Sequence, residues 1–209
     1  MNDPVDIARG PAARRRPWAF SLIELLVSLA LMIILIVMLY GFGSGSHQQQ
    51  QKKACQKNLQ KIYVALEIFA NEHDGAFPNL PGAVSAEDPL SLLVPRYTVD
   101  TSLFVCPGSQ DPQLPSGESF AQRKISYAYF MGRRLTNAGD VLMTDKQVNT
   151  LPKARGDAIF SATGKPPGNN HHRYGGNYLF GDGHVEMSSF TAPFALVWTQ
   201  DVVLLNPKP

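Results

Sequence analysis

The chain has 209 residues, 44% of them hydrophobic, and a formal net charge of +2, which suits one ordinary domain with appendages. The first nineteen residues carry four arginines and two aspartates, so the remainder is formally neutral. This balance, without a nucleic-acid recognition motif, argues against nucleic acid as a partner. The 16 prolines and 17 glycines lie almost entirely outside one apolar block and favour loops and short strands over a helical bundle.

Residues 1–19 read as a basic leader, and residues 20–43 read as an apolar helix whose one charged side chain is Glu24. At 1.5 Å per residue, about twenty residues cross a hydrocarbon core of about 30 Å. No A-x-A cleavage pattern of an ordinary signal peptide follows. The arginines at positions 14–16, directly before the helix, predict a cytoplasmic N-terminus and a single membrane pass.

Glu24 needs an explanation, because an ionised carboxylate inside a bilayer is costly. One interpretation is that Glu24 lies close enough to the cytoplasmic end of the helix to reach the lipid headgroups. The other is that it has a charged partner within the membrane. The residue alone does not decide between them.

Residues 14–27, RRRPWAFSLIELLV, resemble the processing site of type IV prepilins and type II secretion pseudopilins. In that family a basic leader ends at a small residue, usually Gly, and a membrane peptidase cuts before a Phe whose new amine is methylated. The resemblance places the cut between Ala19 and Phe20, with Ala19 departing from the usual Gly. It also implies a partner for Glu24, because the amine of Phe20 on a neighbouring subunit would pair with it in the membrane.

The same resemblance implies a location and partners. The protein would reside in the bacterial inner membrane with its C-terminal domain in the periplasm or outside the cell. Expected partners are the prepilin peptidase, other pilin or pseudopilin subunits in homo- or hetero-oligomers, the inner-membrane assembly platform and membrane lipid. The expected function is a structural subunit of a type IV pilus or a type II secretion pseudopilus. The alternative is a membrane-tethered exported binding or accessory protein that uses the same anchor without polymerising.

Residues 44–75 are expected to form an amphipathic helix that Gly75 and Pro78 end. Apolar side chains recur there at spacings of three and four, with polar residues between them. These apolar positions are Cys55, Leu59, Ile62, Tyr63, Leu66, Phe69 and Ala70. The helix also carries a basic cluster just past the membrane, formed by Lys52, Lys53, Lys57 and Lys61.

Residues 76–209 are expected to form a β-rich exported domain, so the fold class is α+β, with a small antiparallel sheet packed on the amphipathic helix. The candidate strands are 103–105, 126–131, 141–144, 178–180 and 184–187, followed by an apolar stretch over 195–205. Two of them flank Asp182-Gly183, a pair that tolerates positive φ and predicts a two-residue hairpin turn.

The C-terminal half carries a second resemblance. Residues 58–62, Cys106-Pro107 and the spacing from His172 through nine residues to Asp182-Gly183 resemble a pilin-like subfamily defined by a prepilin-type N-terminus and an H-X9-DG element. The resemblance implies a pilin-like fold of one long helix and a small sheet. Within it we expect His172 to donate a hydrogen bond that pins the hairpin.

Two metal sites compete with the plain hairpin interpretation. We do not expect a required cofactor. The first candidate metal is calcium, with Asp182 as a ligand, because major pseudopilins that resemble this chain hold calcium in C-terminal loops. Asp145 is the expected second carboxylate, although the six to eight oxygens that calcium prefers are not evident. Zinc would use His171, His172, His184 and Cys106, but no C-x-x-C or H-E-x-x-H spacing is present.

Cys55 and Cys106 leave two interpretations open. An oxidising exported compartment and a count of two cysteines suit one disulfide. Both could instead be small buried thiols. No phosphate loop, nucleophile elbow or paired acid is complete in the sequence, so we do not expect an enzyme.

Overall fold

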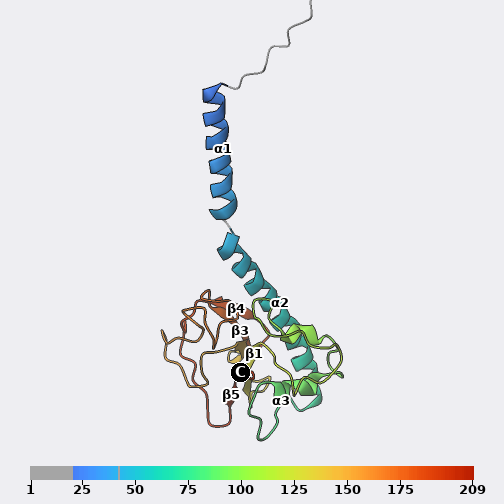
Figure 1. Cartoon of the computed structure of the whole chain (residues 1–209). Helices are drawn as coiled ribbons and strands as arrows, with labels where there is room; N and C mark the ends of the chain where they lie inside the picture. The colour runs from blue at the N-terminus through green and yellow to red at the C-terminus, as the bar shows by residue number, and fades with distance from the viewer. Residues whose placement is uncertain (1–20, 42) are drawn as a thin grey trace, which may run out of the picture. The chain divides into compact units, whose positions relative to one another are not determined.

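A computed structural model of the chain describes residues 21–41 and 43–209. The chain divides into two compact units between Gly43 and Ser44, and each unit is described by itself. Figure 1 gives the order of the helices and strands along the chain.

The first unit contains helix α1, Leu22–Gly41. The backbone carbonyl of Ser21 accepts the first helical hydrogen bonds, from the N–H groups of Glu24 (3.0 Å) and Leu25 (3.1 Å). Every side chain from Ser21 to Leu39 is exposed. The segment Leu22–Leu39 is long and apolar enough to cross a membrane, and its length and composition would equally suit a signal sequence.

Helix α2, Gly43–Glu72, belongs to the second unit from Ser44 onward. The helix ends where Asp74 and Gly75 take positive φ values of 52° and 77°, and Gly75 donates its N–H to Ala70 O at 2.8 Å. The apolar positions expected to face a core are buried, except for the half-buried Tyr63. The amphipathic pattern therefore identified the packing face of α2 correctly.

A five-stranded antiparallel sheet forms the centre of the second unit. Its strands are β1 Tyr127–Met131, β2 Val141–Asp145, β3 Gly176–Phe180, β4 Val185–Ser188 and β5 Val203–Leu205. They lie in the order β4-β3-β2-β1-β5, with β4 and β5 at the two edges. The short helices α3 (Glu87–Leu90), η1 (Ser91–Leu93) and η2 (Thr101–Phe104) lie between α2 and β1 in the chain.

The sheet is covered on both faces. Tyr127, Tyr129 and Leu179 contribute to a core that also contains the apolar face of α2. Alternate strand residues, such as Phe130 and Tyr178, face a second core that is completed by loop residues from 159–160 and 192–204. The three central strands are therefore buried along their whole length.

The α+β class, the long N-terminal apolar helix and the small antiparallel sheet agree with expectation. One expected strand is wrong. Residues 101–104 form the 3-10 helix η2 instead of a strand over 103–105, and Val105 donates its N–H to Ser102 O at 3.1 Å. A short apolar run suits either conformation, because both would bury Leu103 and Phe104.

Candidate functional site

A buried carboxylate, Asp145, ends strand β2 and receives a full set of hydrogen bonds. Asn177 donates its backbone N–H (2.8 Å) and its Nδ2 (3.0 Å) to Oδ2, and Asn170 donates its Nδ2 (2.8 Å) to Oδ1. The Nε2 of His171 lies 3.4 Å from Oδ2. Asp145 therefore ties the end of β2 to the start of β3 and to the loop before it.

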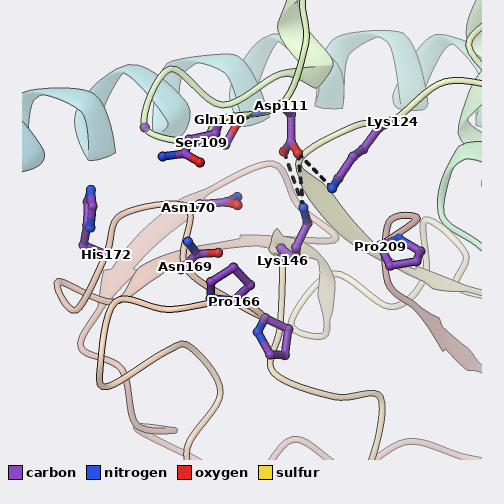
Figure 2. Close-up of a pocket in the computed structure, with 12 residues that line it drawn as sticks. Ser109, Gln110, Asp111, Lys124, Lys146, Pro166, Asn169, Asn170, His172 and Pro209 are labelled. Atoms are coloured by element: carbon purple, nitrogen blue, oxygen red, sulfur yellow. Dashed lines mark hydrogen bonds and ion pairs between the residues drawn. The ribbon is translucent and has the colours of Figure 1, made fainter.

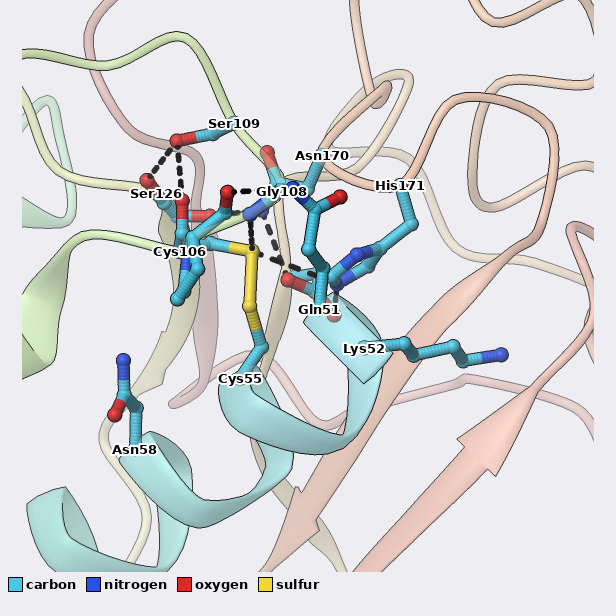
Figure 3. Close-up of a disulfide and its surroundings, with 12 residues drawn as sticks. Gln51, Lys52, Cys55, Asn58, Cys106, Gly108, Ser109, Ser126, Asn170 and His171 are labelled. Atoms are coloured by element: carbon cyan, nitrogen blue, oxygen red, sulfur yellow. Dashed lines mark hydrogen bonds and ion pairs between the residues drawn. A yellow bond between two sulfur atoms is a disulfide. The ribbon is translucent and has the colours of Figure 1, made fainter. Parts of the chain in front are cut away.

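The side chain of His171 is fully buried between this carboxylate and a sulfur atom. Its Nε2 also lies 3.5 Å from Cys106 Sγ, and within the described part of the chain its Nδ1 has no hydrogen-bond partner. Gly108 passes so close that a Cβ there would lie 2.7 Å from this Nδ1. Figure 3 shows His171 beside the disulfide, with Gly108 between Cys106 and His171.

Buried charges surround Asp145. Burial would raise the pKa of Asp145, but the adjacent His171 and the hydrogen bonds from Asn170 and Asn177 outweigh it and hold the pKa below its ordinary value.

Burial lowers the pKa of Lys52, and the charge of Asp145 counters part of that effect. Lys52 belongs to the basic cluster expected from the sequence, yet only 5% of it is exposed. It donates to the backbone carbonyls of Tyr174 and Ser188 and so joins α2 to the sheet edge.

Cys55 and Cys106 are joined by a disulfide with a Cα–Cα distance of 5.3 Å. The bond links α2 to the segment after η2, directly beside His171 (Figure 3). The two sulfurs, Asp145 and His171 lie within 4.8 Å of one another. Because each sulfur is already bonded to the other, neither is a thiolate that could bind zinc, which leaves only one carboxylate and one imidazole in this cluster.

The Asp182-Gly183 hairpin differs in detail from expectation. Gly183 has a positive φ of 88°, but Asp182 does not, so the two-residue turn is wrong. The loop is instead a three-residue one, Gly181 to Gly183: Gly183 donates its N–H to Phe180 O (3.0 Å), and Phe180 donates its N–H to His184 O (3.0 Å). Asp182 accepts the N–H of His184 at 3.0 Å.

The hairpin tip packs on α2 through Tyr63. The Tyr63 hydroxyl donates to Gly181 O at 3.0 Å, and a Cβ at position 183 would lie 2.6 Å from the Tyr63 ring. Gly183 is required here both for its backbone conformation and for this close approach. The Asp-Gly motif therefore acts in holding the sheet against the helix.

The expected pinning of the hairpin by His172 is wrong. His172 is exposed and makes no side-chain hydrogen bond within the described part of the chain. Adjacent residues in this loop point in different directions, and it is His171 that turns inward to Asp145. No local pattern in the sequence distinguishes the two histidines.

A calcium ion shared by Asp145 and Asp182 is also excluded. Asp145 is the last residue of β2, whereas Asp182 follows Phe180, which pairs with Val141, the first residue of β2. At about 3.4 Å per strand residue, the two carboxylates lie more than about 10 Å apart. One ion cannot contact both, since calcium–oxygen distances are about 2.3–2.6 Å.

Glu24 lies in the first turn of α1, where every side chain is exposed. It stands three residues after Ser21, the spacing of a helix capping box, in which the third residue is Glu or Gln. The S-x-x-E spacing fits this pattern, but neither side chain makes a capping hydrogen bond among the described residues. Ala19 and Phe20 lie outside the described residues.

No protein-family model, curated protein or solved structure matches the chain. The resemblance to pilin-like sequences therefore stays a prediction from residues 14–27, 58–62, 106–107 and 172–183.

Proposed function

We propose that the chain is a prepilin-like structural subunit. A prepilin peptidase cuts between Ala19 and Phe20, and the product assembles through α1 into a type IV pilus or a type II secretion pseudopilus. The observation that carries the proposal is α1 itself: an apolar helix with every described side chain exposed and a carboxylate in its first turn. Such a surface is stable only in lipid or against other apolar helices.

The second unit supports an exported location. A disulfide between α2 and the loop domain suits an oxidising compartment such as the periplasm. The N-terminus would remain cytoplasmic, next to the peptidase and the inner-membrane assembly platform. Other subunits would contact α1, and membrane lipid would surround it before assembly.

Processing is the first test. The intact mass of protein extracted from membranes should correspond to a chain that begins at Phe20 with a methylated amine. Recovery of Met1, or of a cut beyond Gly45, would contradict the proposal. Retention of the leader with a stable membrane location would instead favour a tethered protein that does not polymerise.

The role of Glu24 is tested by two substitutions that differ in one property. Glu24→Leu removes both the charge and the side-chain oxygens, whereas Glu24→Gln removes the charge and keeps a polar side chain of similar size. If a charge pair with the Phe20 amine drives assembly, both variants should insert in the membrane and both should lose cross-linked oligomers. Ser28→Ala is the control, because the Ser28 hydroxyl bonds only to Leu25 O of its own helix (2.9 Å) among the described residues. Normal assembly of Glu24→Gln would show that the charge of Glu24 is not needed.

A further inference from the structure

A polar cleft lies on the second unit, next to the buried Asp145 centre, with which it shares Asn170. It has a volume of about 500 Å³, within the range of small-molecule sites. The segment 108–111 forms one wall and the loop 166–172 forms the other, with Lys124 and Lys146 at one end. In Figure 2, Asp111 and these lysines lie together, and His172 lies at the opposite end.

Among the side chains that line the cationic end, two are positive and one is negative. The Asp111 side chain is only 6% exposed, and its carboxylate lies 3.4 Å from Lys146 Nζ and 3.5 Å from Lys124 Nζ. Asp111 also accepts a hydrogen bond from Ser126 Oγ at 2.7 Å. One carboxylate thus faces two ammonium groups, for which it is the only acceptor found within the described part of the chain.

A second carboxylate, Glu87, does not cancel this excess in the cleft. Glu87 is fully buried behind the cleft and accepts the backbone N–H groups of Ile125 and Lys208. Burial lowers the pKa of Lys146; Asp111 counters this effect, Lys124 adds to it, and Glu87 counters it weakly. An additional anion beside Lys146 would relieve this incomplete neutralisation.

Neutral polar groups continue the lining. Gln110, Asn169 and His172 make no side-chain hydrogen bonds within residues 21–41 and 43–209, so their donors and acceptors are free for a ligand. No Phe, Tyr or Trp of the described residues lines the cleft, which argues against a ligand held mainly by stacking.

From these features we infer that the cleft binds a small polar anion, with a carboxylate or phosphate group against Lys124 and Lys146 and a polar body reaching toward His172. The oxyanion would replace part of the long Asp111 contacts with closer charge-assisted hydrogen bonds. This function is independent of assembly through α1, so it holds for a subunit and for a tethered protein alike.

The test is calorimetric titration of the full chain in detergent micelles with glucuronate, glucose 6-phosphate and neutral glucose. The first two probes distinguish a carboxylate from a phosphate ester. At least one should bind with a Kd of about 1 mM, more weakly at high salt, and glucose should not bind. Failure of both anions, or equal binding of glucose, would overturn the inference.

Three variants localise the site. Lys146→Gln should weaken anion binding about tenfold, and Asp111→Asn should strengthen it, because the variant keeps an acceptor for Ser126 and frees both lysines. Lys61→Gln, an exposed lysine on α2, should leave the affinity unchanged. If Asp111→Asn does not fold, Lys124→Gln supplies the same test, with a loss like that of Lys146→Gln. Unchanged affinity in Lys146→Gln would place binding elsewhere and overturn the inference.

Discussion

Two aspartate–histidine pairs lie at opposite ends of β2 and β3, and they differ in everything except residue type. Asp145 and His171 have side chains 1% and 0% exposed and approach to 3.4 Å, whereas Asp182 and His184 are 48% and 46% exposed and approach to 2.5 Å. The shorter contact belongs to the weaker pair, because water screens it and competes for its hydrogen bonds. Burial and the number of partners, more than distance, decide what each pair contributes.

The largest expected effect is the loss of the buried carboxylate. Asp145→Ala leaves the donors of Asn170, Asn177 and His171 buried without their acceptor, so we expect a loss of about 3–5 kcal/mol in the free energy of unfolding. Asp182→Ala, the matched change in the exposed pair, should cost less than about 1 kcal/mol. Unfolding of the full chain in detergent, followed by circular dichroism, measures both. Equal losses would contradict the comparison.

The pH dependence of the free energy of unfolding tests the same buried pair in a second way. The pKa of Asp145 is lowered in the folded protein, so its stabilisation is present above its unfolded pKa of about 3.9 and disappears as the pH falls through the lower folded value. The difference between wild type and Asp145→Ala should therefore shrink well below pH of about 4. A constant difference down to the acid transition would assign the effect to packing.

The disulfide beside the buried pair should give the second largest effect. Cys55 and Cys106 are 51 residues apart, and closing a loop of this length lowers the entropy of the unfolded chain by the equivalent of about 4 kcal/mol, with about 2–4 usual in practice. A Cys55→Ala, Cys106→Ala double variant should lose that amount. It should also unfold identically with and without reductant, whereas wild type should be destabilised by reductant.

At the exposed end of the sheet, Gly183 is a position where a larger residue should destabilise the fold. Gly183→Val places a branched residue at a φ of 88° and its Cβ against the Tyr63 ring, so we expect a loss of roughly 1–3 kcal/mol. Gly82→Val is the control, because Gly82 has a similar φ of 82° but open space around it. Only the Gly183 variant should be partly rescued by Tyr63→Ala. Equal losses without rescue would show that backbone strain accounts for the whole effect.

The sequence predicted the features whose residues lie close together along the chain, and it did not predict those formed by distant segments. The spacing of Leu59, Ile62 and Leu66 lies within one helix, and Asp182-Gly183 lies within one hairpin, so the helix face and the hairpin were recognised, although the length of the turn was not. Asp145 and Asn177 meet only through the register of β2 with β3, which no short pattern encodes. The second core was missed because Ile159 and Phe160 belong to loops without periodicity.

Lys52 shows the same limit. Its sequence neighbours are polar, which predicts a solvated face of the helix, but Tyr174 before β3 and Ser188 at the end of β4 accept its hydrogen bonds and bury it. The chain segments that bury Lys52 lie more than a hundred residues away. Burial of a charged residue by distant segments is therefore the part of the site that only the folded chain reveals.

The smallest expected effect concerns Asp182 and decides whether calcium has any role at the hairpin. Asp182→Asn keeps an oxygen for the N–H of His184, so as a turn residue it should change the free energy of unfolding by less than about 0.5 kcal/mol. Asp145 is too distant to join Asp182 around an ion, and the exposed Glu186 lies on the other side of His184. Two exposed carboxylates fall short of the six to eight oxygens that calcium prefers.

We therefore expect thermal unfolding of the full chain to be the same in calcium and in chelator, for wild type and for Asp182→Asn. A calcium-dependent rise in Tm that the substitution abolishes would instead place an ion on the hairpin and reverse the ranking of these two pairs, because the exposed carboxylate would then carry a ligand that the buried one cannot.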